Sequence, residues 1–334
     1  MRNSLRIAIV GCGAIAGNHV KGVLASDEKL CALCDILPTQ AERLIEKYQL
    51  GEIPVYTNYT EMLDAVKPDA VHICTPHYLH VPMSIEALER GIHVLCEKPL
   101  AISIEQLVQL REAVKNSNAQ LGVCMQNRYE PNLLRAKELA QKEGIDAAFG
   151  DVVWKRDADY YASGDWRGSW EKEGGGVMIN QALHTLDLLQ WICGMPTHVT
   201  AHTENDHLQG VIEVEDTASA RFECPDGSLF NFFATTAAGK SFPAHLRFFL
   251  SNKQTLHAET DLVTLGSNAL ELEKRENSVG KSVWGNGHAI LIRDFYRHVK
   301  KGSPFPIDEK EGEKVVRLIL SMYASGGKRI EVLE

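Results

Sequence analysis

A glycine-rich turn near the start of the sequence constrains the fold more than any other feature. It follows an apolar, strand-like run from Arg6 to Val10 and opens a stretch with helical periodicity. The turn consists of Gly11, Cys12, Gly13, Ala14, Ile15 and Ala16. Its glycines permit a tight turn and let backbone N–H groups approach a pyrophosphate, and the dipole of the following helix favours the same anion. The turn therefore predicts a Rossmann-type sheet that binds a dinucleotide through Gly11 to Ile15.

A carboxylate in the next strand-like run bears on the choice of dinucleotide. Asp35 ends the run from Leu30. At that position a carboxylate accepts hydrogen bonds from a ribose 2′-hydroxyl and repels a 2′-phosphate. The next two residues, Ile36 and Leu37, supply no cation. We therefore expect NAD to be preferred over NADP, the alternative role for Asp35 being a cap of the helix that starts near Pro38.

Strand-like and helical stretches alternate through the first part of the chain, which is typical of a doubly wound parallel sheet. The predicted strands are Arg6 to Val10, Leu30 to Asp35, Ala70 to Thr75, His93 to Cys96 and Leu121 to Gln126. The predicted helices include Thr39 to Tyr48, Pro82 to Arg90 and Ile104 to Lys115. This α/β pattern predicts an NAD-binding domain over residues 1–128.

The ends of the later strands supply further candidate contacts, because ligands of open α/β sheets bind at the carboxyl ends of the strands. The candidates are Thr75, Pro76, His80, Glu97, Lys98 and Gln126 for the cofactor and Arg128 for the substrate. Lys98 is also a catalytic candidate, because its ammonium group can donate to a reacting oxygen beside the nicotinamide. The alternative is a surface lysine that pairs with Glu97.

The pattern changes beyond residue 128. A longer strand is predicted around Asp151 to Lys155, followed by a Gly- and Trp-rich loop from Ser163 to Gly176 and a helix from Val177 to Trp191. Two strands, Thr217 to Glu223 and Leu229 to Thr236, flank a hairpin turn. Helices from about His288 to Lys300 and Glu309 to Tyr323 follow. We expect an α+β domain over residues 129–334, with a mainly antiparallel open sheet, that binds substrate and joins subunits.

Composition excludes several classes of partner. The 35 Lys and Arg residues against 44 Asp and Glu residues give a net charge of −9, which disfavours binding to nucleic acid or anionic lipid. The sequence has no membrane-spanning run and no secretory signal near its start, so we expect a cytoplasmic protein that binds a small molecule. The eight cysteines and the His77/His80 pair lack the company of a metal site, so no metal is predicted.

The predicted helix from Val177 carries polar residues on one face. At about 100° per residue, Asn180, His184 and Asp187 fall within roughly 60° of one another. Three apolar residues point the opposite way: Ala182, Leu186 and Leu189. His184 is therefore a candidate catalytic base, the alternative being a buried histidine that anchors the helix.

These motifs together resemble the glucose-fructose oxidoreductase and inositol dehydrogenase family, Gfo/Idh/MocA. The resemblance rests on the glycine turn with Asp35, on Glu97-Lys98-Pro99, and on the Gly-rich entry to the helix that bears His184. It implies that Lys98 and His184 form the active site. The family usually has an Asp one helical turn before the His, where this chain has Asn180. The substitution deprives His184 of its usual carboxylate neighbour and leaves an amide that can bind a substrate hydroxyl.

The loop before this helix looks like that of family members acting on sugars, including nucleotide sugars. Its aromatic and basic residues include Trp154, Arg156, Tyr160, Tyr161, Trp166 and Arg167. We assign Arg156 and Tyr161 with Asn180 and Arg128 to the substrate, and Trp166 and Arg167 to the cofactor. Such residues suit a sugar ring or an anionic group, the alternative being packing within the loop.

The expected activity is NAD-dependent oxidation, or reversible reduction, of a secondary alcohol on a sugar, nucleotide sugar or cyclitol. His184 would take the hydroxyl proton while Lys98 orients and polarises the oxygen. The alternatives are a glycosidase that uses NAD for transient oxidation and elimination, and a non-catalytic sugar-responsive regulator. The resemblance also implies a homodimer or homotetramer. The substrate and the physiological direction stay open.

Overall fold

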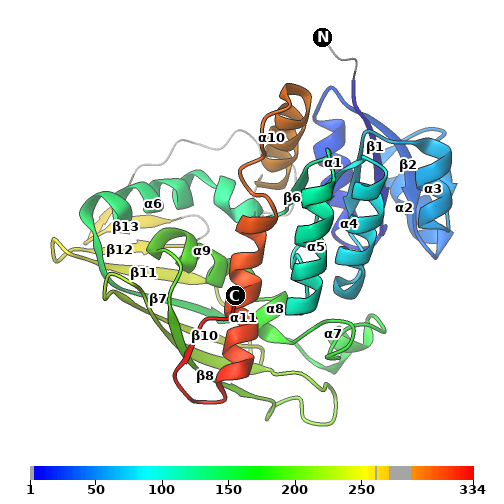
Figure 1. The fold of residues 1–334 in the computed structure, drawn as a ribbon. Helices are drawn as coiled ribbons and strands as arrows, with labels where there is room; N and C mark the ends of the chain where they lie inside the picture. The colour runs from blue at the N-terminus through cyan, green and yellow to red at the C-terminus, as the bar shows by residue number, and fades with distance from the viewer. Residues whose placement is uncertain (1–3, 260–261, 271–286) are drawn as a thin grey trace. The chain divides into compact units, whose positions relative to one another are not determined.

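A computed structural model describes residues 4–259, 262–270 and 287–334, which belong to two compact units (Figure 1). The first unit comprises Met1–Gln126 and Ser278–Glu313, and the second comprises Asn127–Asn277 and Lys314–Glu334. The first break lies close to the predicted boundary at residue 128. The segment from Ser278 to Glu313 differs from the prediction, because it belongs to the first unit.

The first unit contains a six-stranded sheet in the order β3-β2-β1-β4-β5-β6, with every pair parallel. Its strands are β1 (Arg6–Val10), β2 (Lys29–Cys34), β3 (Val55–Tyr56), β4 (Ala70–Ile73), β5 (His93–Cys96) and β6 (Leu121–Val123). The central strands are almost fully buried, as their continuous apolar sequences require. The predicted doubly wound parallel sheet is confirmed.

Helices connect these strands and cover the sheet. They are α1 (Ala16–Leu24), α2 (Pro38–Tyr48), α3 (Tyr59–Val66), α4 (His80–Glu89) and α5 (Ile104–Asn116). A later helix, α10 (Gly287–Lys301), packs against α1. Gly22 permits this packing, since a Cβ atom there would lie 2.4 Å from Cδ1 of Ile292. Phe295 and Phe305 press in the same way on Gly122 of β6, which explains why this late segment belongs to the first unit.

The second unit contains a nine-stranded sheet in the order β14-β13-β12-β11-β7-β10-β9-β8-β15. Its strands are β7 (Ile145–Val153), β8 (His198–Glu204), β9 (Thr217–Glu223), β10 (Leu229–Thr235), β11 (His245–Leu250), β12 (Thr255–Ala258), β13 (Val263–Leu265), β14 (Asn268–Ala269) and β15 (Ile330–Glu331). Only β7 and β10 run parallel among the described pairs, so the predicted, mainly antiparallel sheet is confirmed. Strand β7 begins earlier than the predicted start at Asp151.

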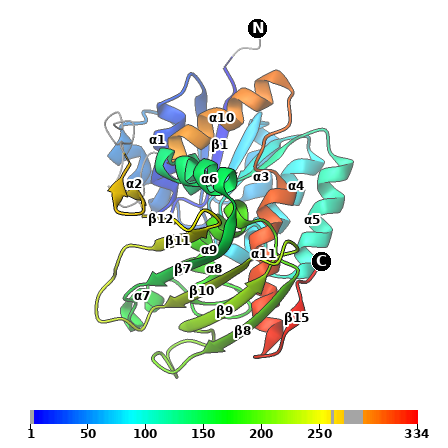
Figure 2. The same ribbon diagram turned by 90° about the vertical axis from the view of Figure 1, so that its left-hand side faces the viewer.

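One face of this sheet forms the core of the second unit. Phe222, Phe230, Phe232 and Phe248 point to that face and are at most 2% exposed. Helices α6 (Pro131–Glu143) and α9 (Leu183–Cys193) pack on it (Figure 2). The other face is open, with Phe249 44% exposed on β11. Alternation along each strand produces these two faces.

The predicted helix from Val177 to Trp191 is two helices in the structure. Helix α8 (Val177–Asn180) ends at Asn180, and α9 begins three residues later, at Leu183. The N–H of Ala182 donates to the carbonyl of Val177, five residues back, which is the pattern of a π-type turn. The regular rotation of 100° per residue therefore does not give the angle between the Asn180 and His184 side chains.

Two further α-helices and two short 3-10 helices, His77–Leu79 and Gln126–Tyr129, complete the described elements. Helix α7 (Ala158–Ala162) precedes α8, and α11 (Glu309–Ser325) begins in the first unit and ends in the second. None of the described helices combines the length and apolar character that crossing a membrane requires.

Candidate functional site

The glycine turn of the first unit has the geometry of a phosphate cradle. Gly11 has φ +82°, and a Cβ atom there would lie 2.6 Å from the backbone of Cys74, so only glycine fits. A Cβ atom added at Gly13 would meet no atom of the described residues within 4 Å beyond its chain neighbours. The backbone at Gly13 is thus open to an approaching ligand at the start of α1, where the helix dipole favours an anion.

Asp35 braces this turn. Its Oδ2 accepts a hydrogen bond from the backbone N–H of Cys12 at 2.7 Å, and its Oδ1 accepts one from the N–H of Leu37 at 2.8 Å. The residue that caps α2 is Leu37, so Asp35 is not itself the helix cap. A carboxylate has about four lone-pair sites, which leaves Asp35 able to accept from ribose hydroxyls as well.

Cys12 and Thr75 contribute to the same region in different ways. The Cys12 side chain is buried, and burial raises the pKa of its thiol to about 12; the residue therefore presents no thiolate, and its backbone N–H is bonded to Asp35. The Oγ1 atom of Thr75 is buried without a hydrogen-bond partner in the part of the chain that the structure describes. An orphaned hydroxyl at the end of a parallel strand suits a bound ligand.

Glu97 points into the interior of the first unit, which differs from its predicted contact with the cofactor. It is 4% exposed, and its Oε1 lies 2.9 Å from Nε2 of His19 and 3.2 Å from Nε2 of His288. Burial alone would raise the pKa of Glu97, but the hydrogen bonds from His19 and His288 outweigh it and hold this pKa well below its ordinary value. Its Oε2 accepts from the N–H of Lys98 at 3.2 Å.

A chain of buried hydrogen bonds extends from Glu97. Nδ1 of His19 lies 3.0 Å from Nδ1 of His72, and Nε2 of His72 lies 3.0 Å from the hydroxyl of Tyr296. Burial lowers the pKa of both histidines. With neutral rings, one arrangement satisfies the chain: Tyr296 donates to His72, His72 to His19, and His19 to Glu97. Sequence reasoning missed this cluster, because its histidines are isolated in the sequence.

The ligating atoms of His19, Glu97 and Cys124 lie within 4.8 Å of one another. The hydrogen bond between His19 and Glu97 already joins two of these atoms. Burial raises the pKa of the Cys124 thiol well above its usual value, and a metal would need the thiolate. We therefore interpret the group as a hydrogen-bonded cluster.

Lys98 itself is half-buried and follows β5, and its peptide bond to Pro99 is cis. His80 holds this turn from below. Its Nδ1 lies 2.6 Å from the carbonyl oxygen of Pro99, and its Nε2 lies 2.9 Å from that of Thr75. His80 is 1% exposed, so it joins the turns after β4 and β5 and acts on a ligand only through them. Pro76 begins the turn after β4, and Gln126 is buried after β6.

The second unit brings together a different set of predicted residues. Glu173 is fully buried and accepts hydrogen bonds from the backbone N–H of Gly168 and from Nδ2 of Asn180. Nδ2 of Asn180 also lies 3.3 Å from the hydroxyl oxygen of Tyr160. Glu173 thus places a carboxylate beside Asn180. Asn180 itself occupies the position at which the family usually has an Asp.

Tyr160 is the residue on which this network converges, and sequence reasoning had assigned its neighbour instead. Its hydroxyl oxygen receives Nη1 of Arg167 at 2.7 Å and Nε2 of Gln181 at 3.1 Å. Tyr161 is 5% exposed and packs in an apolar cluster with Leu208, Ile212 and Val214. Burial raises the pKa of its hydroxyl. The structure therefore gives Tyr161 a packing role, because adjacent residues of α7 point in different directions.

The basic residues of the loop surround the same tyrosine. The guanidinium carbons of Arg156 and Arg167 lie 4.7 and 4.6 Å from the centre of the Tyr160 ring. Arg156 also lies over Trp154, and Arg167 over Trp166. These cation–π contacts bring Trp166 and the two arginines to one place.

Arg128 has a buried ion pair, which differs from the predicted contact with substrate. Its Nη2 and Nε donate to the two carboxylate oxygens of Asp187 at 2.7 and 2.9 Å, and both side chains are at most 4% exposed. Asp187 therefore anchors α9, although we predicted that it shares a reactive face with His184. His184 is 7% exposed.

Glu215 fixes the Gly-rich entry to α8. Its carboxylate accepts from the N–H groups of Gly176 and Met178 at 2.9 and 3.0 Å and from the Tyr323 hydroxyl at 3.0 Å. A Cβ atom at Gly176 would lie 1.9 Å from the carbonyl oxygen of Glu215. Burial raises the pKa of Glu215 to about 7. Sequence reasoning missed Glu215, since a single Glu before a strand carries no signal.

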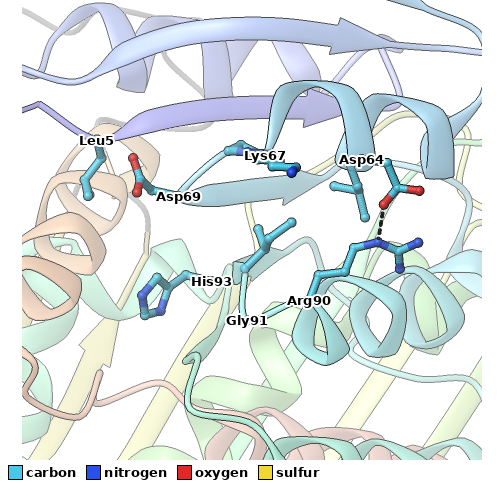
Figure 3. A pocket seen from close by; sticks show the side chains of 10 residues that line it. Leu5, Asp64, Lys67, Asp69, Arg90, Gly91 and His93 are labelled. Carbon is cyan, nitrogen blue, oxygen red and sulfur yellow. Dashed lines mark hydrogen bonds and ion pairs between the residues drawn. The ribbon is translucent and has the colours of Figure 1, made fainter.

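A separate hollow lies at the amino ends of the parallel strands, away from their carboxyl ends. Figure 3 shows Leu5, Lys67, Asp69 and His93 around it, with Arg90 bonded to Asp64. Leu5, Asp69 and His93 lie where β1, β4 and β5 begin. Ligands of such sheets bind at the carboxyl ends of the strands, so this hollow is not the candidate dinucleotide site.

Comparison with known proteins covers both units. Residues 5–125 match the family model described as an oxidoreductase family with an NAD-binding Rossmann fold, GFO_IDH_MocA. Residues 133–254 match the GFO/IDH/MocA C-terminal domain.

Individual relatives are similar over most or part of the chain. D-glucoside 3-dehydrogenase of Escherichia coli is 27% identical, and the match covers 98% of this chain and 97% of the relative. The NAD(+)-dependent scyllo-inositol 2-dehydrogenase of Bacillus subtilis is 28% identical over 60% of this chain and 58% of its own. The WlbA dehydrogenase of Bordetella pertussis, solved with NADH and UDP-GlcNAcA, is 25% identical, with a TM-score of 0.86, 100% of this chain covered and 99% of the other.

Proposed function

The chain belongs to the Gfo/Idh/MocA family of oxidoreductases, and from this premise we propose that it is an NAD-dependent dehydrogenase of a sugar, nucleotide sugar or cyclitol. The observation that carries the proposal is the cradle formed by Gly11 and Gly13 and braced by Asp35 at the carboxyl ends of a parallel sheet. Relatives that match 98% and 60% of the chain are a dehydrogenase of glucosides and one of scyllo-inositol.

The residues of the first unit fit NAD. Gly11 to Ile15 would receive the pyrophosphate and Asp35 the adenosine ribose, while the unpartnered Thr75 hydroxyl would meet the cofactor near the strand ends. When bound, NAD supplies a nicotinamide ring that accepts or returns a hydride. Asp35 disfavours the 2′-phosphate of NADP because like charges repel.

Two residues are proposed to act on the substrate's hydroxyl group. His184 removes the hydroxyl proton as the carbon loses a hydride, and returns it in the reverse direction. Lys98 donates a hydrogen bond to the same oxygen and stabilises the negative charge that develops on it. Glu97 and His80 keep the Lys98 turn in place and do not themselves touch substrate.

A substrate screen tests this function. The protein is incubated with NAD and a panel of glucosides, uronic acids, inositols and nucleotide sugars, and NADH is followed at its absorption band. We expect NADH formation with at least one polyol of the panel. Release of an aglycone without net NADH would identify the glycosidase alternative. Tight sugar binding with neither product would identify the regulator alternative.

The open face of the nine-stranded sheet is our proposed surface for self-association into a homodimer or homotetramer. It carries the exposed Phe249 and the half-buried Phe149 and Phe233, and apolar side chains on an open sheet favour a partner. Light scattering coupled to size exclusion measures the mass; a monomer at micromolar concentration contradicts this proposal.

All eight cysteines are free thiols, which agrees with the cytoplasmic location that we propose.

A further inference from the structure

We propose that Arg156 binds an oxyanion of the substrate, a carboxylate or a phosphate, so that the protein selects an acidic sugar derivative over its neutral counterpart. This assignment narrows the substrate class of the same site and therefore rests on the proposed function. All of the residues involved belong to the second unit. They are Arg156 itself, the aromatic side chains that hold it and the charged groups around it.

The guanidinium group of Arg156 has one edge without an acceptor. Nη1 is the only guanidinium nitrogen of this residue that donates to a described residue, and it lies 2.8 Å from the carbonyl oxygen of Lys155. Nε is buried and has no hydrogen-bond partner among the same residues. A buried donor that is left unsatisfied costs free energy. The edge formed by Nε and Nη2 therefore favours an acceptor supplied by a ligand.

The same edge binds a carboxylate at two other arginines of this unit. Nε and Nη2 of Arg128 donate to the two carboxylate oxygens of Asp187 at 2.9 and 2.7 Å. Nε and Nη2 of Arg329 donate to Glu223 at 3.0 and 2.7 Å. This side-on fork matches the oxygens of a carboxylate or a phosphate. Arg156 thus keeps for a ligand the edge with which arginine holds an oxyanion.

Two aromatic rings hold the Arg156 guanidinium group in place. Its central carbon lies 5.0 Å from the centre of the Trp154 ring and 4.7 Å from that of the Tyr160 ring. Both rings are themselves fixed: Nε1 of Trp154 donates to the carbonyl oxygen of Phe242 at 3.2 Å, and the Tyr160 hydroxyl oxygen accepts from Nη1 of Arg167 at 2.7 Å. Because the fork is already oriented, a ligand pays less conformational entropy to use it.

Two positive charges gather at Tyr160. The guanidinium carbons of Arg156 and Arg167 lie 4.7 and 4.6 Å from the centre of its ring. The acidic residues nearest to them in the sequence, Asp157 and Asp165, form ion pairs with lysines instead. Like charges at close range repel each other, and a bound anion relieves this repulsion. In a chain of net charge −9, the local excess of positive charge favours an anionic ligand.

Tyr160 also relates Arg156 to the residue at the family's Asp position. Nδ2 of Asn180 lies 3.3 Å from the Tyr160 hydroxyl oxygen, while Arg156 lies over the ring of the same tyrosine. Because a tyrosine ring and a pyranose ring are of similar width, one substrate can reach Asn180 with a hydroxyl group and Arg156 with an acidic group. The buried Glu173 is bonded to Asn180 and forms no ion pair with Arg156.

A binding experiment that needs no turnover tests the anion site. The protein, with and without NADH, is titrated calorimetrically with hexuronates and hexose phosphates, and with the neutral hexuronamides and hexoses that match them. We expect an acidic sugar to bind at least about tenfold more tightly than its neutral counterpart. A preference for the carboxylate identifies a sugar acid as the ligand, and a preference for the phosphate identifies a sugar phosphate or nucleotide sugar.

Variants assign this preference to Arg156. Arg156→Gln should lower the affinity for the acidic sugar by about tenfold or more and should change that for the neutral one by less than about threefold. Arg156→Lys keeps the charge but lacks the side-on fork, so its affinity for the acidic sugar should be intermediate. The control is Arg135→Gln, which removes the same charge from an exposed position of α6 and should bind like the wild type.

The outcomes distinguish this site from its alternatives. Equal binding of acidic and neutral sugars by the wild type, or an unchanged preference in Arg156→Gln, overturns the proposal. An equal loss of NADH affinity in Arg156→Gln also overturns it, because the anion would then be the pyrophosphate of the cofactor. Thermal melting verifies that the variants fold, and Arg156→Lys decides if Arg156→Gln does not. A preference for acidic sugars without NADH formation upholds the anion site and contradicts only the dehydrogenase activity.

Discussion

The Nε2 atom of His19 lies 2.9 Å from Oε1 of Glu97, so the carboxylate next to Lys98 is tied to the interior of the first unit. Nε2 of His288 lies within hydrogen-bonding distance of the same oxygen, and the other oxygen, Oε2, accepts a hydrogen bond from the backbone N–H of Lys98. The backbone that presents Lys98 is therefore fixed by a buried anion and two histidines from α1 and α10.

Replacing Glu97 should destabilise the first unit. In Glu97→Gln, the amide nitrogen must face one of the N–H donors that bind the carboxylate in the wild type. That buried donor is then left unsatisfied, which costs about 1–3 kcal/mol. Urea denaturation measures the free energy of unfolding, with the exposed Glu89→Gln as the control. A Glu97→Gln variant as stable as the control would contradict the inward orientation of the carboxylate.

Acidification should weaken the buried histidine cluster. Burial lowers the pKa of His19 and His72 in the folded chain. At a pH below the ordinary histidine pKa, these two residues are therefore protonated in the unfolded chain but not in the folded chain. Their contribution to stability is therefore present above about pH 6.5 and is lost as the pH falls below it. The variant His72→Asn should lose less stability than the wild type between neutral and mildly acidic pH. Parallel pH profiles would rule this explanation out.

Glu215 should act in the opposite direction. Its pKa of about 7 lies above the ordinary value of 4.5 because of burial, so the folded chain binds a proton that the unfolded chain releases. Stability should therefore fall as the pH rises from about 4.5 to 7, by on the order of 3 kcal/mol. Glu215→Gln should remove this slope. The measurement is the difference in unfolding free energy between the two proteins, which cancels the histidine effect.

Cofactor choice should follow Asp35. Asp35→Ser combined with Ile36→Arg replaces a repelling anion with a cation, and Ile36 is 84% exposed, so its replacement does not disturb the core. We expect the affinity ratio of NADPH to NADH to rise by about tenfold or more. Calorimetry measures both ligands, with Ile36→Arg alone as the control. If the wild type binds NADPH as well as NADH, Asp35 is not the selecting residue.

Lys98 should separate binding from chemistry. Lys98→Ala removes the donor to the reacting oxygen, so kcat should fall by about 100-fold or more. NADH affinity should change little, because Gly11, Gly13 and Asp35 are intact. Stopped-flow turnover and fluorescence titration of NADH measure the two quantities. Near-normal kcat would return Lys98 to a structural role beside Glu97.

The parts of the fold predictable from sequence are those in which local chemistry has one solution. A tight turn at Gly11 needs glycine, and a buried parallel strand needs an apolar run, so the order of β1, α1 and β2 follows directly. The turn sequence Pro225-Asp226-Gly227-Ser228 also predicts the hairpin of β9 and β10.

What escaped prediction depends on contacts between distant residues. The widened turn at Ala182 changes the direction of His184 relative to Asn180, and no local periodicity announces it. Arg128 looks like a ligand contact until Asp187 appears beside it. Glu97 looks like a partner of Lys98 until α10 brings His288 to it. In each case, a charged group found a buried partner far away in sequence.

The path of the chain between the two units has a consequence for its synthesis. Strand β6 is completed only when Phe295 and Phe305 pack on Gly122 and the N–H of Val123 donates to the carbonyl of Ile307. A ribosome delivers these residues after nearly the whole second unit has emerged. The first unit, although it leads the sequence, must therefore wait with an uncovered sheet edge, and a chain truncated after Gln126 should need chaperones or aggregate.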